Sequence, residues 1–319
     1  METASPDPRA PADGRFRLGL IGAGRMGRTH LEAIRDSDRV VVAGVVEPRP
    51  EGRLVIREAG VPAFASLEEL LSAADIDGAL IAAPTDRHLE LLRRVMAAGI
   101  PVLCEKPCGL NVDEAAQCAS VAAGAGLALQ VAYWRRFVPE LVVLRQRILR
   151  GELGEILAVN CYQWDTAPPP ATFRESSGGM FVDMGVHEFD EIRWLTGQEF
   201  GMVRVASSRL GASAGDPDCA QLVAELDGGS TAMVSLGRWH PAGDSCKVEV
   251  FGTRGTAMSW FLQPADDDGS FRQALRLQAE DFARSIRTGA GSGASIIDAI
   301  AALTVAGLAS DPLITKSSA

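Results

Sequence analysis

Residues 16–27 read FRLGLIGAGRMG, an apolar run that leads into a glycine-rich turn. In this G-x-G-x-x-G pattern Gly22 permits a tight turn, Gly24 lets a pyrophosphate approach because it has no Cβ, and Gly27 lets the next helix pack closely on the strand. The N-terminus of that helix directs N–H groups at the phosphates. The pattern alone is a weak signal, but its place between a strand and a helix predicts a dinucleotide-binding turn. The cofactor contacts are expected from Gly22, Gly24, Arg25, Met26 and Gly27.

An acidic residue is expected about 20 residues beyond such a turn, at the end of the second strand. Glu47 stands there, directly after the β-branched run 40–46. A carboxylate at this place accepts hydrogen bonds from the adenosine ribose and repels a 2′-phosphate, which favours NAD over NADP. Arg49, two residues further on, is suited to bind a phosphate, so NADP stays the alternative.

The rest of the first half alternates short apolar runs with helical patterns. Strands are expected at 16–21, 40–46, 78–82, 101–104 and 127–131, and helices at 26–36, 50–59, 87–98 and 113–123, with a further helix capped by Ser66. Fully apolar strands that alternate with helices indicate a parallel sheet covered on both faces. Residues 15–134 are therefore predicted to form an α/β Rossmann dinucleotide-binding domain.

The second half has a different pattern. Strands are expected at 156–163, 202–208, 221–226, 231–236 and 247–251, joined in part by glycine-rich hairpin turns. Helices are expected at 138–150, 181–195, 271–287 and 294–309. We therefore predict an α+β domain with a mainly antiparallel sheet over 135–319, which holds substrate and supports oligomerisation, and whose C-terminal helices can pack back on the first domain. Residues 1–14, rich in Pro, Asp and Ala, are expected to be a disordered tail.

Composition excludes several classes of function. The 319 residues carry a formal net charge of −10, which argues against nucleic acid and anionic membrane as partners. No uncharged apolar stretch of 18 residues and no secretory signal occur, and the six cysteines form no C-x-x-C pair, so we expect a cytoplasmic protein with free thiols. Four histidines without metal-ligand spacing predict no metal site.

The triplet Glu105-Lys106-Pro107 comes directly after an apolar strand. Ligands of doubly wound sheets bind at the carboxyl ends of the strands, so this pair of charges is expected at the crevice where a nicotinamide would lie. A salt-bridged turn on the surface is the alternative explanation.

The stretch 177–190, SGGMFVDMGVHEFD, contains three ionisable groups at helical spacing. Asp183 and His187 are four residues apart and Asp190 is three further on, so they are expected on one face of a helix. A carboxylate one turn from an imidazole can orient it and stabilise its protonated form, as a general base requires. A solvated helix face with a surface histidine is the alternative.

Together these motifs resemble the glucose–fructose oxidoreductase/inositol dehydrogenase (Gfo/Idh/MocA) family. The similarity runs from about residue 16 almost to the end of the chain, and the segments 164–170 and 177–195 look most like the inositol 2-dehydrogenase branch. That branch usually has a tyrosine-containing segment where this chain reads RWHPAGD at 238–244, so a substrate-contacting ring is either missing here or replaced by Trp239 or His240.

The resemblance implies an NAD(P)-dependent dehydrogenase that acts on the CH–OH groups of a cyclic polyol or sugar, in a homodimer or homotetramer. It implies that Lys106 is the catalytic lysine, that His187 takes the hydroxyl proton and that Asp183 orients the site. Further cofactor contacts are implied for Pro84, Thr85, His88 and Glu105. Substrate contacts are implied for Lys106, Arg135, Asp165, Asp183, His187 and Asp190. A non-catalytic NAD(H)-binding sensor with the same fold, and an enzyme that uses the cofactor for transient oxidation only, are the alternatives.

Overall fold

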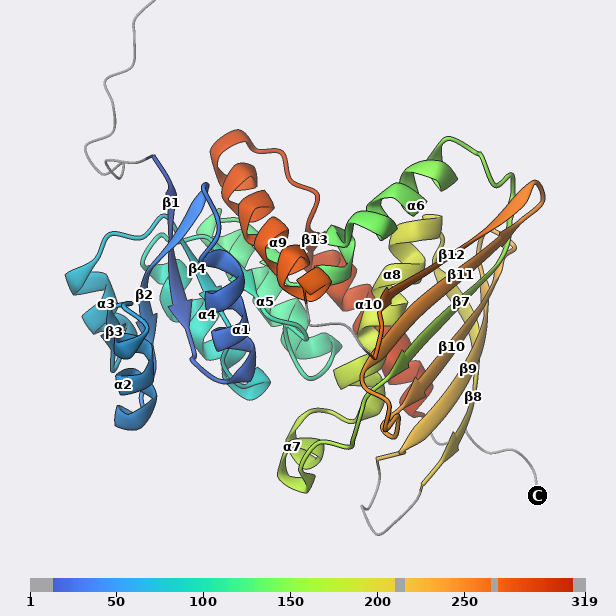
Figure 1. Cartoon of the computed structure of the whole chain (residues 1–319), viewed down its shortest axis with the longest axis horizontal. Coiled ribbons are helices and arrows are strands. Elements are labelled where there is room, and N and C mark those ends of the chain that lie inside the picture. The colour runs from blue at the N-terminus through green and yellow to red at the C-terminus, as the bar shows by residue number, and fades with distance from the viewer. Residues whose placement is uncertain (1–13, 210–215, 265–268, 312–319) are drawn as a thin grey trace, which may run out of the picture.

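The computed structural model describes residues 14–209, 216–264 and 269–311. They form two sheets with helices packed around them (Figure 1). The tail that was expected at 1–14 lies outside the described residues, apart from Gly14.

The first sheet has seven strands in the order β13-β6-β5-β4-β1-β2-β3. All its pairings are parallel except that of β13 with β6, which is antiparallel. The strands are β1 (Phe16–Ile21), β2 (Val40–Val46), β3 (Ala63–Phe64), β4 (Gly78–Ile81), β5 (Val102–Cys104), β6 (Leu129–Val131) and β13 (Ala294–Ser295). β1 lies between β2 and β4, so the strand order reverses there and opens a crevice at the carboxyl ends of β1 and β4.

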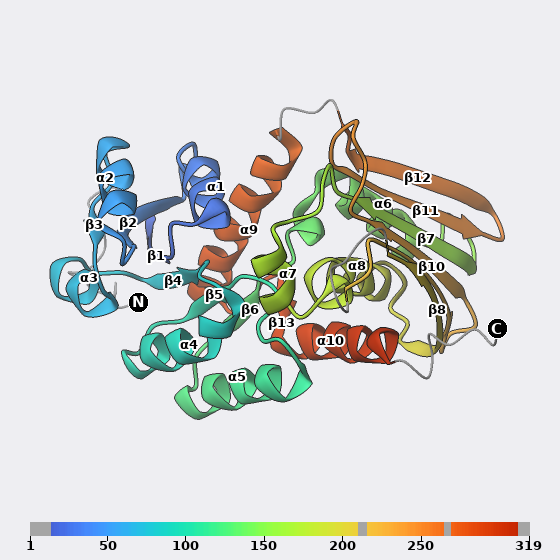
Figure 2. The same ribbon diagram turned by 90° about the horizontal axis from the view of Figure 1, so that it is seen from below.

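Helices cover both faces of this sheet, as the fully apolar strands predicted. Its helices are α1 (Arg25–Ile34), α2 (Pro50–Glu58), α3 (Leu67–Ala73), α4 (His88–Ala97) and α5 (Val112–Ala125). α1 packs with α9 (Gly269–Thr288) on one face, and α4 with α5 on the other (Figure 2). β4 is completely buried between these layers, which fixes the crevice on a rigid frame.

The second sheet has six strands in the order β12-β11-β7-β10-β9-β8. Only the pairing of β7 with β10 is parallel, so the sheet is mainly antiparallel, as expected. The strands are β7 (Ile156–Trp164), β8 (Phe200–Ser208), β9 (Cys219–Leu226), β10 (Thr231–Gly237), β11 (Ser245–Gly252) and β12 (Gly255–Leu262). The helices α6 (Pro139–Leu149) and α8 (Val186–Thr196) lie on one face of the sheet, and no helix of the described residues covers its other, open face (Figure 1).

The C-terminal helices pack against helices of both halves of the chain. α9 packs against α1, and α10 (Ile296–Ser310) lies between α5 and α8. The division of the chain after residue 134 remains a prediction, since the last helices belong to both halves. No helix in the described ranges is long and apolar enough to cross a membrane.

Candidate active site

The glycine turn has the shape that a pyrophosphate requires. Gly22 has φ +102°, and a Cβ there would lie 2.6 Å from the Ala82 carbonyl oxygen. A Cβ on Gly27 would lie 2.0 Å from the Gly22 oxygen, so helix and turn touch directly. A Cβ on Gly24 would meet nothing within 4 Å, which leaves an open cradle at the N-terminus of α1. The turn therefore fits a dinucleotide.

Glu47 lies at the carboxyl end of β2, beside this turn. Its Oε2 accepts a hydrogen bond from the Ala23 N–H at 3.3 Å, and its Oε1 accepts one from the Arg49 Nε at 2.8 Å. The hydrogen bond from Arg49 holds the pKa of Glu47 below its ordinary value. Glu47 and Arg49, the two alternative contacts for the adenosine ribose end of the cofactor, therefore form one ion pair.

Two of the three candidates that follow β4 are open to a ligand. Pro84 is exposed and Thr85, in the short turn η1 (Thr85–Arg87), is half-buried. His88 is buried, with Nδ1 2.9 Å from the Pro107 oxygen and Nε2 2.8 Å from the Ala83 oxygen. Both ring nitrogens are engaged by the backbone, so His88 braces the two loops instead of facing the cofactor.

Glu105 joins the two loops that would hold the cofactor. Its Oε1 lies 2.6 Å from Nε2 of His30, which is on α1, and its Oε2 accepts the Lys106 N–H at 3.0 Å. Burial opposes its ionisation, but the hydrogen bond with His30 and the charges of His30 and Lys106 lower the pKa of Glu105 overall. Sequence reasoning missed His30, although its place three residues after Gly27 in the turn's own helix was visible.

Lys106 reaches across to the second domain. Its Nζ donates to the Asp183 carbonyl oxygen at 2.6 Å and lies 3.5 Å from Asp183 Oδ1. Both side chains remain partly exposed, at 19% and 17%. The alternative of a surface salt-bridged turn is thereby excluded, because the lysine pairs with a residue 77 positions away at a junction of the two domains.

Asp183 lies in a turn of π-helix, η3 (Phe181–Gly185), that leads into α8. His187 follows on α8, 7% exposed, with its ring edge against Tyr133 and Trp134. Its pKa is well below the ordinary value, because burial and the charges of Lys106 and Arg135 disfavour the imidazolium. The expectation that Asp183 stabilises the protonated ring is therefore wrong. Asp183 interacts with Lys106, and the ring is held neutral.

Arg135 does not face the substrate space. Its guanidinium is buried, with Nη1 2.6 Å from Glu188 Oε1 and 2.7 Å from Glu191 Oε2, and Nη2 donates to Gln163 at 2.7 Å. The geometry does not support the substrate contact that the resemblance implied for Arg135. Instead, this arginine is shared by two carboxylates of α8, and its charge acts on His187.

This shared arginine leads to a prediction about stability. Burial, with the nearby charges of Glu188 and Asp190, raises the pKa of Glu191 to about 7 from 4.5, against the opposing effect of Arg135. The folded chain keeps a proton that the unfolded chain releases, so this contribution to stability is complete below pH 4.5 and is lost as the pH rises to about 7. The loss amounts to at most about 3.5 kcal/mol, at about 1.4 kcal/mol per unit of pKa shift.

Glu191→Gln should remove this loss of stability between pH 4.5 and 7, because glutamine does not ionise. The free energy of unfolding of the variant, measured by urea titration from pH 4.5 to 8, is expected to rise relative to wild type as the pH increases. Glu58→Gln, at an exposed glutamate of α2, is the control and should show no such trend. A constant difference between Glu191→Gln and wild type at every pH would contradict the prediction.

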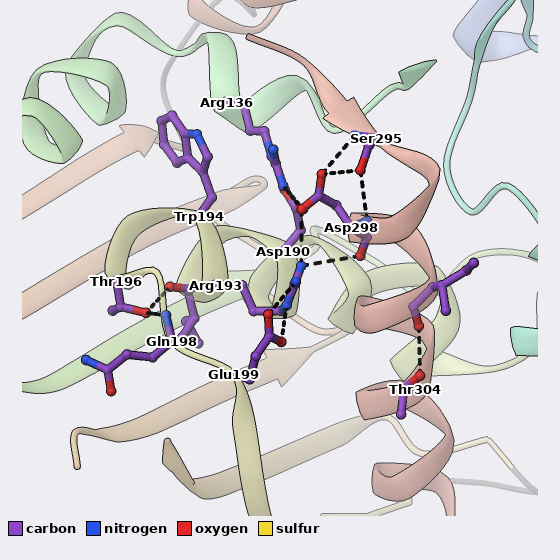
Figure 3. Close-up of polar contacts among 12 residues, drawn as sticks. Arg136, Asp190, Arg193, Trp194, Thr196, Gln198, Glu199, Ser295, Asp298 and Thr304 are labelled. Carbon is purple, nitrogen blue, oxygen red and sulfur yellow. Dashed lines mark hydrogen bonds and ion pairs between the residues drawn. The ribbon is translucent and has the colours of Figure 1, made fainter. Parts of the chain in front are cut away.

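Asp190 belongs to a structural network (Figure 3). Its Oδ2 and Oδ1 accept hydrogen bonds from Arg136 Nε at 2.9 Å and Nη2 at 2.6 Å. The same Nη2 lies 3.1 Å from Asp298, which caps α10 together with Ser295. The Asp190 side chain is 2% exposed. Both oxygens are used and shielded, so the structure does not support the expected contact of Asp190 with substrate hydroxyls.

Asp165 and Arg238 complete the site beside Asp183. Burial raises the pKa of Asp165, and the charges of Asp244 and Asp183 add to this against a hydrogen bond from Gln163. Arg238 is completely buried, with Nη1 3.4 Å from Asp183 Oδ2. Sequence reasoning considered Trp239 and His240 in this segment and missed Arg238, because no motif marks a lone arginine at a strand end.

Comparisons with known proteins agree with the order of the two domains. The family described as "Oxidoreductase family, NAD-binding Rossmann fold" matches residues 16–133, and the GFO/IDH/MocA C-terminal domain matches residues 141–258. The chain is 48% identical over 302 residues to the rhizopine catabolism protein MocA of Rhizobium meliloti, covering 94% of this chain and 95% of that protein.

Solved structures agree as well. A putative myo-inositol dehydrogenase from Sinorhizobium meliloti 1021 superposes with a TM-score of 0.86 at 30% identity, covering 92% of this chain and 95% of the other. A scyllo-inositol dehydrogenase from Lactobacillus casei, solved with NAD(H) and scyllo-inositol, gives a TM-score of 0.83 at 25% identity, with the same coverage.

Proposed function

The chain belongs to the GFO/IDH/MocA family of oxidoreductases, and on this premise we propose that it oxidises a hydroxyl-bearing carbon of a cyclic polyol or sugar with NAD. The observation that carries the proposal is the meeting of Lys106, Asp183 and His187 between the two domains, beside the dinucleotide turn. A non-catalytic NAD(H) sensor would need the cofactor turn but not these three residues, and no observation favours the sensor.

Each residue of the site has a separate role in the proposed oxidation. NAD supplies the hydride acceptor when it is bound. His187, held neutral by burial and by two cations, accepts the hydroxyl proton without first having to lose one of its own. The Lys106 ammonium faces the negative charge that develops on the substrate oxygen. Asp183 sets the position of Lys106, and we assign to Asp165 and Asp183 the hydrogen bonds with ring hydroxyls of the substrate.

The test is reduction of NAD or NADP, followed by absorbance, on a panel of cyclitols, aldoses and sugar acids. Turnover of an inositol isomer with NAD is the expected result. Tight NADH binding with no turnover on the whole panel would reject the dehydrogenase in favour of the sensor. Release of a sugar without net NADH formation would instead indicate transient oxidation.

We propose that NAD is preferred over NADP because Glu47 places a carboxylate beside the turn. Glu47→Gln keeps the shape and removes the charge. It should lower the ratio of kcat/KM for NAD to that for NADP by about 10-fold or more, which corresponds to about 1.4 kcal/mol. Glu58→Gln, at an exposed acid at the far end of α2, is the control and should leave the ratio unchanged. Wild-type preference for NADP would make Arg49 the dominant contact.

We propose that the open face of the second sheet is covered by another copy of the chain. Apolar side chains emerge there from β12 and β9, with exposures of 62% for Met258, 43% for Trp260 and 53% for Val223. Apolar area of this kind marks an interaction surface. Met258→Asp combined with Trp260→Asp should convert a dimer or tetramer into monomers in sedimentation velocity. Leu54→Asp, on the exposed face of α2, should not.

We propose a cytoplasmic location. All six cysteines are free in the structure and all but Cys219 are buried, which suits a reducing compartment. The net charge of −10 supports a small-molecule substrate as the partner, without nucleic acid or membrane.

A further inference from the structure

Arg238 stands directly after β10 and is completely shielded from solvent. Its Nη1 lies 3.4 Å from Asp183 Oδ2, and its Nη2 lies 3.4 Å from Asp216 Oδ2. Its Nε and Nη2 have no hydrogen-bond partner within the described parts of the chain. A buried guanidinium that is short of hydrogen bonds costs free energy, so its place requires an explanation beyond packing.

A series of alternating charges runs through Arg238. At its far end Arg174, on α7 (Ala171–Ser176), donates to Asp216 Oδ2 at 2.7 Å and to Asp218 at 3.0 Å. Asp216 Oδ1 also accepts the Met180 N–H at 2.7 Å, just before the π-helical turn that carries Asp183. Asp216 is thus fixed on two sides, and it fixes Arg238 in turn.

At the near end, Asp183 is shared between two cations. Its Oδ2 is 3.4 Å from Arg238 and its Oδ1 is 3.5 Å from Lys106 Nζ. Both separations exceed the roughly 2.7–2.9 Å of a charge-assisted hydrogen bond. The carboxylate is therefore drawn toward both cations and closes tightly on neither.

We propose that Arg238 is a positioning residue, which holds Asp183 back from Lys106 so that the ammonium stays free to face the reacting hydroxyl. This inference rests on the proposed dehydrogenase function. Without Arg238, the carboxylate would close on Lys106 and neutralise much of its charge toward the substrate and toward His187.

The effect can be read on His187 without substrate or cofactor. The charges that act on this ring are those of Lys106, from the loop after β5, and Arg135, from the segment before α6, and the Tyr133 ring packs edge to face with it. Asp183 pairs with Lys106, and Glu188 pairs with Arg135. Lys106 disfavours the imidazolium, so neutralising Lys106 must raise the pKa of His187.

The experiment is an NMR titration of histidine-labelled full-length protein, which is tractable because the chain has only four histidines. His187→Asn assigns the signal. Arg238→Met should raise the pKa of His187 by about half a unit to one unit, whereas Arg238→Lys, which keeps the charge, should stay within about 0.2 units of wild type. An unchanged value in Arg238→Met, or the same shift in Arg238→Lys, would overturn the proposal.

A double-mutant cycle tests whether the effect passes through Asp183. In an Asp183→Asn background, Arg238→Met should no longer shift His187. A full shift in that background would show direct action of Arg238 and reject the positioning role. Because the titration needs no turnover, failure of the dehydrogenase assignment would be seen separately, in the substrate panel.

Discussion

Replacing Lys106 by methionine is expected to lower kcat by about 1,000-fold or more, because the variant loses the cation that faces the developing alkoxide. Methionine keeps the length of the aliphatic stem, so packing around the loop is largely retained. The Lys106 side chain is 19% exposed at the junction of the domains, and its Nζ contacts Asp183 through the carbonyl oxygen at 2.6 Å and the more distant carboxylate. The kinetic constants of wild type and variant on the same substrate measure the effect.

A cofactor titration separates this loss from a damaged fold. NADH binding by Lys106→Met, followed by fluorescence, should stay within about threefold of wild type, because the cradle is built on the turn around Gly24. Lys106→Arg keeps the charge and should retain more activity than the methionine variant. If Lys106→Met kept more than about a tenth of the wild-type rate while a deuterium isotope effect showed that hydride transfer limits it, Lys106 would have no catalytic role.

The nucleotide-binding half could be predicted almost element by element. The observed bounds of β1 and β2 coincide with the two apolar runs beside the glycine turn. Ser66 accepts the Glu69 N–H as the capping pattern predicted. Strands buried on both faces need continuous apolar sequence, and helix caps need particular side chains, so both can be predicted from a few neighbouring residues.

Elements that depend on distant partners were missed. β13 has two residues, and it exists because Ala294 pairs with Val131, far back along the chain. β12 was missed because Gly255, Thr256 and Ala257 weaken its apolar signal, and it forms by pairing along β11. α7 has only six residues, and its Arg174 is held by Asp216 and Asp218 from another segment.

The candidate site shows the same limit. Helical spacing grouped Asp183, His187 and Asp190, but it could not tell which neighbours each would meet. Asp190 meets Arg136, 54 residues earlier, and the π-helical turn rotates Asp183 toward Lys106. Spacing within one helix identifies candidate residues, whereas their roles depend on the elements packed against that helix.

The second large effect concerns His187. His187→Gln should lower kcat by about 100- to 10,000-fold, the range for loss of a general base. Glutamine keeps a polar head of similar reach against Tyr133 and Trp134, but it cannot accept a proton at neutral pH. The loss should appear mainly in kcat, with NADH binding unchanged.

The pH profile identifies the histidine as the base. Burial first, and then the charges of Lys106 and Arg135, keep the pKa of His187 well below 6.5. The neutral, proton-accepting ring therefore persists below pH 6.5, and wild-type kcat/KM should fall only at a more acidic pH. Glu188→Gln removes the negative charge that partly offsets Arg135. Arg135 then disfavours the imidazolium more strongly, so the fall of kcat/KM on the acidic side of the profile (the acidic limb) should move to a lower pH. His187→Gln should abolish the acidic limb altogether.

An acidic limb that remains in His187→Gln at the wild-type pH would assign the proton transfer to another group. Asp165, whose pKa is raised within the same site, would then be the next residue to test.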